Sequence, residues 1–298
     1  MFQSHLGELA ALATAGCWTV TSMSFEAAGK RIGSLSVNLI RLVMALLFLS
    51  LTCWATIGAP YPAGASAHAW TWLAISGVIG FTIGDLCLFR AFVLVGARTG
   101  MLLMSLVPPV TALIGYLLLG ELLAPLDWVG MGLTVGGVSW VVSERRRGQT
   151  GEAQGRPVAG ILLGLGGACG QAVGLVLSKY GMEDYDPVAA NLIRVYAGTL
   201  GFALIFTAIR GWPRVLAALK NRPAMLRVTL GAVFGPFLGV SLSLYAVQLT
   251  ETGVASTIMS VVPVLIIPPA ILVFKEKVSV RAFAGAVAAV GGVALLFL

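Results

Sequence analysis

Asp85 is the one acidic residue that lies well inside a long apolar segment of this chain, on the same helical face as Phe81 and Leu88. A carboxyl group in that position could gain and lose a proton during a transport cycle. Arg41 lies at a similar depth in the preceding apolar segment, so the two side chains can meet. An ion pair would hold the carboxylate in its charged form, which suits a structural role better than a proton relay. We therefore interpret Arg41 and Asp85 as a structural pair, with coupling to protons as the alternative.

Polar, aromatic and thioether side chains recur at helical spacing in several other apolar segments. They are Thr14, Trp18 and Thr21; Gln171; Met101, Met104 and Ser105; Ser241, Tyr245 and Gln248; and Ser256, Met259 and Ser260. Aromatic rings and thioethers suit the apolar body of a solute, whereas hydroxyls and amides can orient its polar head. Ser and Thr are also ordinary contacts between membrane helices, so packing is the alternative. We interpret the set as the lining of a substrate-binding cavity.

The residue types that build enzyme active sites and metal centres are scarce. The chain has two histidines, His5 and His68, and no HExxH, GxSxG, Walker A or CxxC pattern. We therefore expect no catalytic residue, no cofactor and no metal. A membrane-embedded enzyme and a channel are the alternatives from other classes. The sequence shows neither the polar constellation that such an enzyme needs nor a filter motif or charged ring.

The proportion of charged residues is too low for the surface of a soluble protein. Of the 298 residues, 58% are hydrophobic and 10% are charged, and the mean hydropathy is +0.95. A soluble domain carries about a quarter charged residues. Most of the surface must therefore face lipid. The net charge of +7 comes from basic residues in short loops, so we expect a lipid bilayer and a small molecule as partners, and no nucleic acid.

Ten apolar runs are long enough to cross a hydrocarbon core, which takes about 20 residues each. We predict transmembrane helices at 6–27, 34–56, 70–92, 96–119, 126–143, 158–179, 187–209, 224–247, 252–274 and 279–297. The fold class is therefore an all-α integral membrane protein. A linker at 148–157 separates two predicted units, residues 1–147 and 158–298.

The two units repeat each other. Asn38-Leu-Ile-Arg41 recurs as Asn191-Leu-Ile-Arg194, and Met104-Ser-Leu-Val-Pro108 recurs as Met259-Ser-Val-Val-Pro263. The spacing is 153 residues for the first pair and 155 for the second. Each unit has five spans, an odd number, so the second must enter the membrane in the opposite orientation. This inverted-repeat plan is typical of secondary transporters, and it makes Trp18 and Gln171 equivalent positions.

Small residues and prolines recur within the predicted helices. Matching rows of small residues at four-residue spacing are Ser76, Gly80 and Gly84 in the first unit and Gly231, Gly235 and Gly239 in the second. Such faces let helix backbones approach closely. Each proline removes one helix hydrogen bond, so kinks are expected. We predict hinges at Pro108, Pro109, Pro236 and Pro263.

Basic residues are distributed unevenly between the two sides of the membrane. Of the 19 lysines and arginines, 15 lie in loops that follow odd-numbered spans, whereas the loops of the opposite side hold only Lys179. By the positive-inside rule the crowded side is cytoplasmic. We predict a multi-pass protein of the cell inner membrane with both termini on the periplasmic side.

Inversion also brings charged residues of the two units to the same depth. Arg41 lies with Glu276 on the cytoplasmic side, and Arg194 lies with Glu121 on the outer side. Alternative partners for Arg194 in the preceding loop are Glu183, Asp184 and Asp186. An arginine facing the cavity could instead bind a substrate carboxylate through two parallel hydrogen bonds. We interpret these residues as structural ion pairs or coupling groups.

The chain resembles the EamA-type ten-helix branch of the drug/metabolite transporter superfamily over nearly its whole length. The resemblance rests on Val107-Pro-Pro109 leading to Glu121 and on Val262-Pro263 leading to Lys275-Glu276. It also rests on the Gly-Gly pairs at 136–137 and 291–292 and on the arginine early in spans two and seven. Lys275 departs from the family pattern, which has glycine before the acid, so a shared role for the two acids does not follow.

The resemblance implies a transporter that exports amino acids or other metabolites. From the candidate lining we predict export of amino acids with aromatic or apolar side chains by alternating access, active or facilitative. Another metabolite or a drug-like solute is the alternative substrate, because a fold does not choose its cargo.

Overall fold

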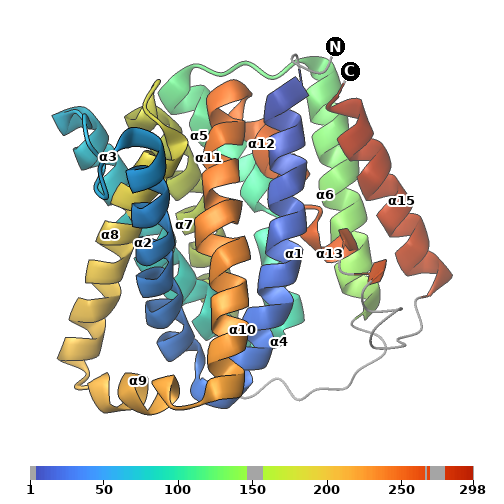
Figure 1. Cartoon of the computed structure of the whole chain (residues 1–298). Helices are drawn as coiled ribbons and strands as arrows, with labels where there is room; N and C mark the ends of the chain where they lie inside the picture. Colours follow the sequence, from blue (N-terminus) through green and yellow to red (C-terminus); the bar gives the residue numbers. More distant parts are fainter. Residues whose placement is uncertain (1–4, 146–156, 266, 269–278, 298) are drawn as a thin grey trace.

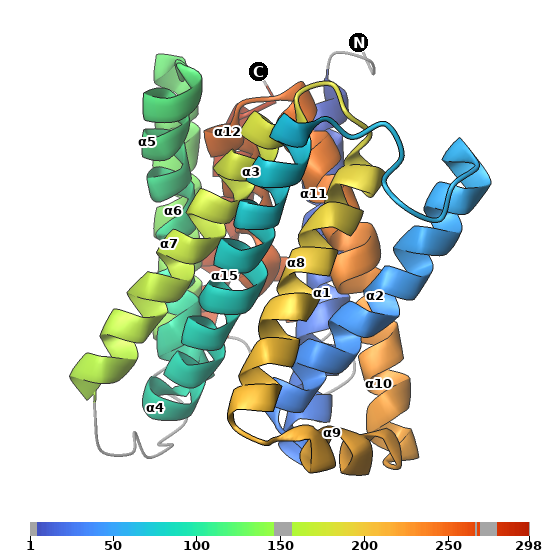
Figure 2. The same cartoon turned by 90° about the vertical axis from the view of Figure 1, so that its left-hand side faces the viewer.

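The described part of the chain is helical throughout and forms one bundle. The computed structural model describes residues 5–145, 157–265, 267–268 and 279–297. The N- and C-termini lie at the same end of the bundle, which we call the termini end (Figure 1). The short helix α9 lies across the opposite end, which we call the α9 end (Figures 1 and 2).

The helices of the first unit are α1 (Leu6–Ile32), α2 (Ser34–Ile57), α3 (Ala67–Gly77), the π-helical segment η2 (Val78–Gly84), α4 (Asp85–Met104), α5 (Val107–Leu119) and α6 (Pro125–Arg145). Those of the second unit are α7 (Pro157–Met182), α8 (Pro187–Ala208), α9 (Trp212–Leu219), α10 (Arg222–Ala232), the π-helical segment η4 (Val233–Phe237), α11 (Leu238–Leu249), α12 (Thr252–Met259), α13 (Val262–Leu265) and α15 (Val280–Leu295).

Helix ends follow from local residue chemistry. Ser66 accepts a hydrogen bond from the Ala69 amide at 3.0 Å and so caps the start of α3. Asp186 does the same for the Ala189 amide at 2.9 Å, before the proline that opens α8. Gly58 ends α2 with a φ of 76°, a left-handed conformation that glycine adopts without steric cost.

The prediction of an all-α membrane protein with ten spans in two repeats is confirmed. Five helical segments are long and apolar enough to cross a membrane: Ser34–Ile57, Ala67–Ala91, Val158–Met182, Pro187–Ala208 and Arg222–Leu249. Shorter apolar helices are Val107–Leu119 and Phe283–Leu295. The other spans contain α1, α6 and the short helices α12 and α13.

Two predicted span boundaries differ from the structure. A loop was expected at 93–95, but helix α4 continues through these residues to Met104. The interruption lies instead at Ser105 and Leu106, directly before the proline pair of α5. An equivalent interruption at Ser260 and Val261 separates α12 from α13. Proline lacks the amide hydrogen that would continue the helix, so both breaks fall just before it.

Helix packing obeys the inverted repeat. Helix α1 packs on α10, η4 and α11, and its counterpart α7 packs on α3, η2 and α4. Equivalent helices of the two units also pack on each other, α2 on α8 and α6 on α15. The segment η2 thus packs on α7 and α8 of the second unit, and η4 packs on α1 and α2 of the first.

Candidate functional site

The π-helical segments η2 and η4 occupy equivalent places in the two units, since Val78 and Val233 begin them at the 155-residue spacing of the repeat. A π-helical turn leaves the ordinary hydrogen-bond ladder and often marks a functional position. Pro236 lies inside η4 and explains its break. The segment η2 has no proline among its residues, so the equivalence belongs to the fold and not to one residue type.

Trp18 and Gln171 lie against the ends of these π-helical segments. A Cβ atom added at Gly239 would lie 2.7 Å from Trp18 Nε1, and one added at Gly84 would lie 3.6 Å from the Gln171 backbone nitrogen. Both glycines therefore leave room for the neighbouring helix. Trp18 and Gln171 are half-buried, each on the helix that packs against the irregular span of its partner unit.

Asp85 is the first residue after η2, and it lies in a buried polar cluster. Its Oδ2 accepts a hydrogen bond from Arg41, with which it forms an ion pair. Its Oδ1 accepts a hydrogen bond from Gln171 Nε2 at 2.9 Å. The Arg41 guanidinium also lies over the rings of Phe25, at 5.3 Å, and Phe89, at 5.8 Å. The Arg41–Asp85 contact expected from the sequence is thus present, and it joins α2, α4 and α7.

The ion pair that the sequence predicted for Arg194 is not formed among the described residues. Its side chain is buried, and its guanidinium lies 5.0 Å from the centre of the Phe81 ring. Within the described residues it forms no ion pair with Glu121, Glu183 or Asp184. The outer-side loop is out of reach because the Arg194 side chain points toward η2, where Nη2 is the nearest atom to a Cβ added at Gly80.

Glu121 instead joins three helices at the termini end. Its Oε1 accepts a hydrogen bond from Lys179 Nζ at 2.7 Å. Its Oε2 accepts bonds from the Thr252 amide at 2.9 Å and from the Thr252 hydroxyl at 2.6 Å. Lys179 also donates to the Thr250 carbonyl at 2.7 Å. We call Glu121, Lys179, Thr250 and Thr252 the termini-end latch. Glu276, the equivalent of Glu121 in the second unit, lies outside the described residues.

The candidate lining residues fall into two groups by environment. Thr14 and Thr21 are buried and donate to carbonyls of their own helix, Ala10 at 2.8 Å and Cys17 at 3.0 Å. Buried side chains in the fourth and ninth spans are Ser105, Pro108, Ser256 and Met259. Half-buried ones are Met104, Pro109 and Ser260. The side chains of Met101 and Pro263 lie outside the described part.

The polar residues of α11 face different surroundings. Ser241 is buried and accepts a hydrogen bond from Asn191 Nδ2 at 3.1 Å. Tyr245 is 38% exposed. Gln248 donates to the carbonyls of Glu183, at 2.8 Å, and Tyr185, at 3.1 Å, so it holds the loop between α7 and α8. The three residues therefore do not share one environment.

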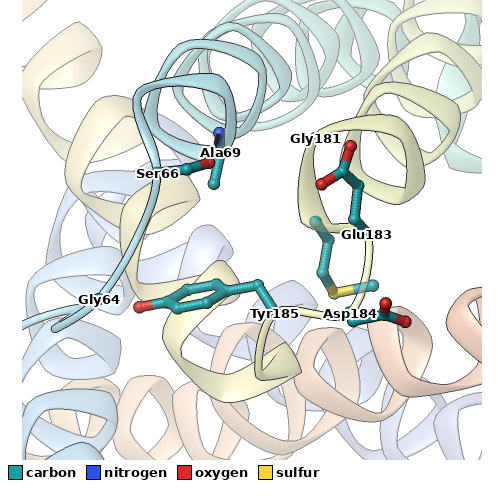
Figure 3. Close-up of a pocket in the computed structure, with 8 residues that line it drawn as sticks. Gly64, Ser66, Ala69, Gly181, Glu183, Asp184 and Tyr185 are labelled. Carbon is teal, nitrogen blue, oxygen red and sulfur yellow. Dashed lines mark hydrogen bonds between the residues drawn. The ribbon is translucent and has the colours of Figure 1, made fainter.

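Two recesses lie at the termini end, away from Asp85. Figure 3 shows one of about 210 Å³, between the segment that carries Gly64 and Ser66 and the turn from Gly181 to Tyr185. The Tyr185 hydroxyl donates to the Ala63 carbonyl at 2.9 Å, and burial raises the pKa of Tyr185 to about 12. The other recess, of about 450 Å³, is lined by Leu119, Glu121, Lys179, Tyr180, Glu183, Asp184 and Gln248. It lies directly beside the termini-end latch.

The networks include residues that the sequence patterns did not mark as site residues, among them Lys179, Asn191 and Thr252. Lys179 could have been found, because it is the single basic residue in the loops of its side. Asn191 stood within the repeated Asn-Leu-Ile-Arg motif. Thr252 carried no such signal. Among the described residues, no group of three or more His, Cys, Asp and Glu side chains could hold a metal ion.

Comparison with known proteins places this architecture in a family. No curated protein matches the chain. A solved structure titled "Crystal structure of protein" is similar to it in fold, with a TM-score of 0.77 and 17% sequence identity over 97% of this chain and 95% of that chain. The model described as "EamA-like transporter family" matches residues 5–143 and again residues 158–298. The chain therefore belongs to the EamA-like transporter family, which indicates a membrane transporter of small solutes.

Proposed function

We propose that this protein exports amino acids with aromatic or apolar side chains across the cell inner membrane by alternating access. The observation that carries the proposal is the pairing of irregular helices between the repeats. The segments η2 and η4 are equivalent, and so are the breaks at Ser105–Leu106 and Ser260–Val261. Asp85 and Gln171 meet at the end of η2, and Trp18 lies against Gly239, two residues beyond η4.

The physical argument concerns unsatisfied backbone groups. Inside a bilayer, irregular backbone is tolerated only where it is buried in protein or lines a cavity. In inverted-repeat transporters, discontinuous helices form the substrate site near the bilayer midplane. One repeat then moves against the other around that site. The four irregularities of this chain lie in the third, fourth, eighth and ninth spans, at equivalent places in both repeats.

The side chains around the irregular helices favour an amphipathic solute. Trp18 and Met104 offer an aromatic ring and a thioether, which suit an apolar side chain. Gln171 and the neighbouring charged cluster offer polar contacts for a charged head. An exporter of another metabolite or drug-like solute is the alternative, and it predicts counterflow with a different panel of solutes.

For the orientation in the membrane, the uneven distribution of basic residues between the loops supports both termini on the periplasmic side. For energy coupling, the paired state of Asp85 favours a mechanism in which this carboxylate keeps its charge. Protons as the coupling ion are the second candidate, since Asp85 is a buried acid directly after the π-helical segment η2.

Counterflow in proteoliposomes tests the function. We expect purified protein to exchange labelled phenylalanine or leucine with the same unlabelled amino acid inside, with and without a pH gradient. Replacement of Trp18 by alanine should slow exchange at least fivefold. Trp54, which is 62% exposed on α2, provides the matched control, and its replacement should leave exchange unchanged. If ions and all tested solutes crossed the membrane equally fast and no counterflow occurred, the protein would be a channel and the proposal would be refuted.

A further inference from the structure

Arg194 carries a buried positive charge that has neither an ion pair nor a hydrogen-bond acceptor among the described residues. Only 5% of the residue is exposed. Within the described residues no carboxylate lies in ion-pair distance of its guanidinium, no acceptor forms a hydrogen bond with it, and its Nε is buried without a partner. An arginine has five N–H donors, and buried polar groups are almost always satisfied. The N–H groups of Arg194 can therefore donate to an acceptor that the described residues do not supply.

The nearby charges do not supply that acceptor. Arg194 lies within electrostatic range of Asp85. However, Oδ1 of Asp85 accepts from Gln171 and Oδ2 accepts from Arg41. Two arginines thus share one carboxylate, and the cluster of Arg41, Asp85 and Arg194 keeps a net positive charge. A second anion would neutralise it.

The inverted repeat indicates the position of such an anion, beside Arg194 as Asp85 lies beside Arg41. Arg41 and Arg194 are equivalent residues, and Arg41 is paired with Asp85. The residue equivalent to Asp85 in the second unit is Val240, at the same spacing that relates η2 to η4. The second unit therefore has the arginine and lacks the acid.

The Arg194 guanidinium lies beside the ring of Phe81 and the backbone of Gly80, both in η2. Phe81 covers one face of the guanidinium at 5.0 Å. Nη2 lies beside Gly80, where an added Cβ would be 3.4 Å away. Gly80 in turn packs against Gly174 of α7. Arg194 is seven residues into α8, about 10 Å from its start at 1.5 Å per residue, so it lies deep in the membrane.

We propose that Arg194 binds the carboxylate of the transported solute, in the place that Asp85 takes for Arg41. This inference rests on the proposed transporter function and narrows it to solutes that carry a carboxylate. A guanidinium suits this role because its planar fork donates two parallel hydrogen bonds to a carboxylate. The ring of Phe81 beside it offers an apolar surface for the rest of the solute.

Binding to purified protein tests the proposal without requiring transport. The probes are phenylalanine, 3-phenylpropionate, which keeps the carboxylate and lacks the amine, and phenethylamine, which keeps the amine and lacks the carboxylate. We expect the two carboxylates to raise the Tm of the native protein and phenethylamine to leave it unchanged. In Arg194→Gln the carboxylates should lose affinity at least tenfold. Arg210→Gln, at an exposed position of the α9 end, is the control and should keep the native response.

The stability of the unliganded variants separates binding from a structural role. Arg194→Gln removes an unpaired buried charge, so its Tm without ligand should equal or exceed that of the native protein. Arg194→Lys keeps the charge and should bind carboxylates more weakly than arginine. The proposal is overturned if carboxylates do not stabilise the native protein, if Arg194→Gln responds as the native protein does, or if both variants fail to fold. Carboxylate binding without counterflow of phenylalanine would uphold it and refute amino-acid export instead.

Discussion

The side-chain amide of Asn191 donates a hydrogen bond of 2.8 Å to the carbonyl oxygen of Pro236, inside the π-helical segment η4. The same amide donates to Ser241 at 3.1 Å. A side chain of α8 thus donates both to η4 and to α11. The equivalent residue of the first unit, Asn38, is fully buried, and neither its Nδ2 nor its Oδ1 has a partner among the described residues.

This difference predicts unequal effects of the same substitution at two equivalent positions. Asn191→Ala removes two buried hydrogen bonds, to Pro236 and to Ser241, and should lower the free energy of unfolding by about 1–3 kcal/mol. Asn38→Ala removes an amide that makes no bond, so its cost should be close to zero. Thermal unfolding of the two variants in one detergent compares them directly. Equal losses of stability at both positions would contradict the prediction.

The pair of Arg41 and Asp85 should contribute to folding more than to proton coupling. Removing one member of a buried ion pair costs about 3–5 kcal/mol, because the other charge is stranded. Asp85→Asn should therefore reduce the yield of folded protein, and the double change Arg41→Ala with Asp85→Ala should recover part of it. Folded yield, counterflow and pH-driven uptake are measured on each purified variant. Normal yield and counterflow for Asp85→Asn, with loss of pH-driven uptake, would identify a proton relay and refute this view.

The termini-end latch should restrict access to the centre of the bundle from that end. Glu121→Ala removes the acceptor that holds Lys179 and Thr252, so the helices α5, α7 and α12 can separate there. We expect a cysteine at Leu175 to react several times faster with a membrane-impermeant thiol reagent in Glu121→Ala than in the parent without native cysteines. The control is Tyr116→Ala, a neighbouring position of α5 that is 55% exposed. An unchanged rate in Glu121→Ala would show that the latch does not gate access.

Close packing at Gly239 should make that position intolerant of any side chain. A Cβ atom there would lie 2.6 Å from the Phe234 carbonyl oxygen and 2.7 Å from Trp18 Nε1. Gly239→Ala should cost about 1–3 kcal/mol and slow transport, because Trp18 must move. Gly132 of α6 has nothing within 4 Å of an added Cβ. Gly132→Ala should be neutral or stabilise the helix by up to about 1 kcal/mol. Similar destabilisation of both variants, measured by thermal unfolding, would count against the packing argument.

Membrane orientation can be tested with reporter fusions. An alkaline phosphatase reporter after Leu298 should be active, because we place both termini in the periplasm. A fusion after Lys220, just beyond α9, should be inactive, since basic loops remain in the cytoplasm. The reversed pattern would overturn the proposed topology.

Several features of the site were readable in the sequence because they depend on local pattern. The depth of Arg41 and Asp85 in neighbouring spans was enough to predict that they meet, and the repeat was enough to make Trp18 and Gln171 equivalent. The partner of Glu121 was not predictable in this way. Lys179, on α7, lies as near to the termini end as Glu121 does, whereas the Arg194 side chain turns toward η2. Side-chain direction at a given depth depends on helix rotation, which apolar runs do not encode.

Composition, apolar run length and internal repetition determined by themselves that this chain is a ten-span membrane protein of two inverted units, because lipid imposes one rule on every crossing segment. Tertiary structure alone decided that η2 and η4 are π-helical and that Asn191 donates to Pro236 while Asn38 has no partner among the described residues. It also decided that none of the described carboxylates lies within ion-pair distance of Arg194. These features arise from contacts between helices far apart in the chain. Their geometry depends on how closely two backbones approach, and that distance cannot be predicted from a linear pattern of apolar residues.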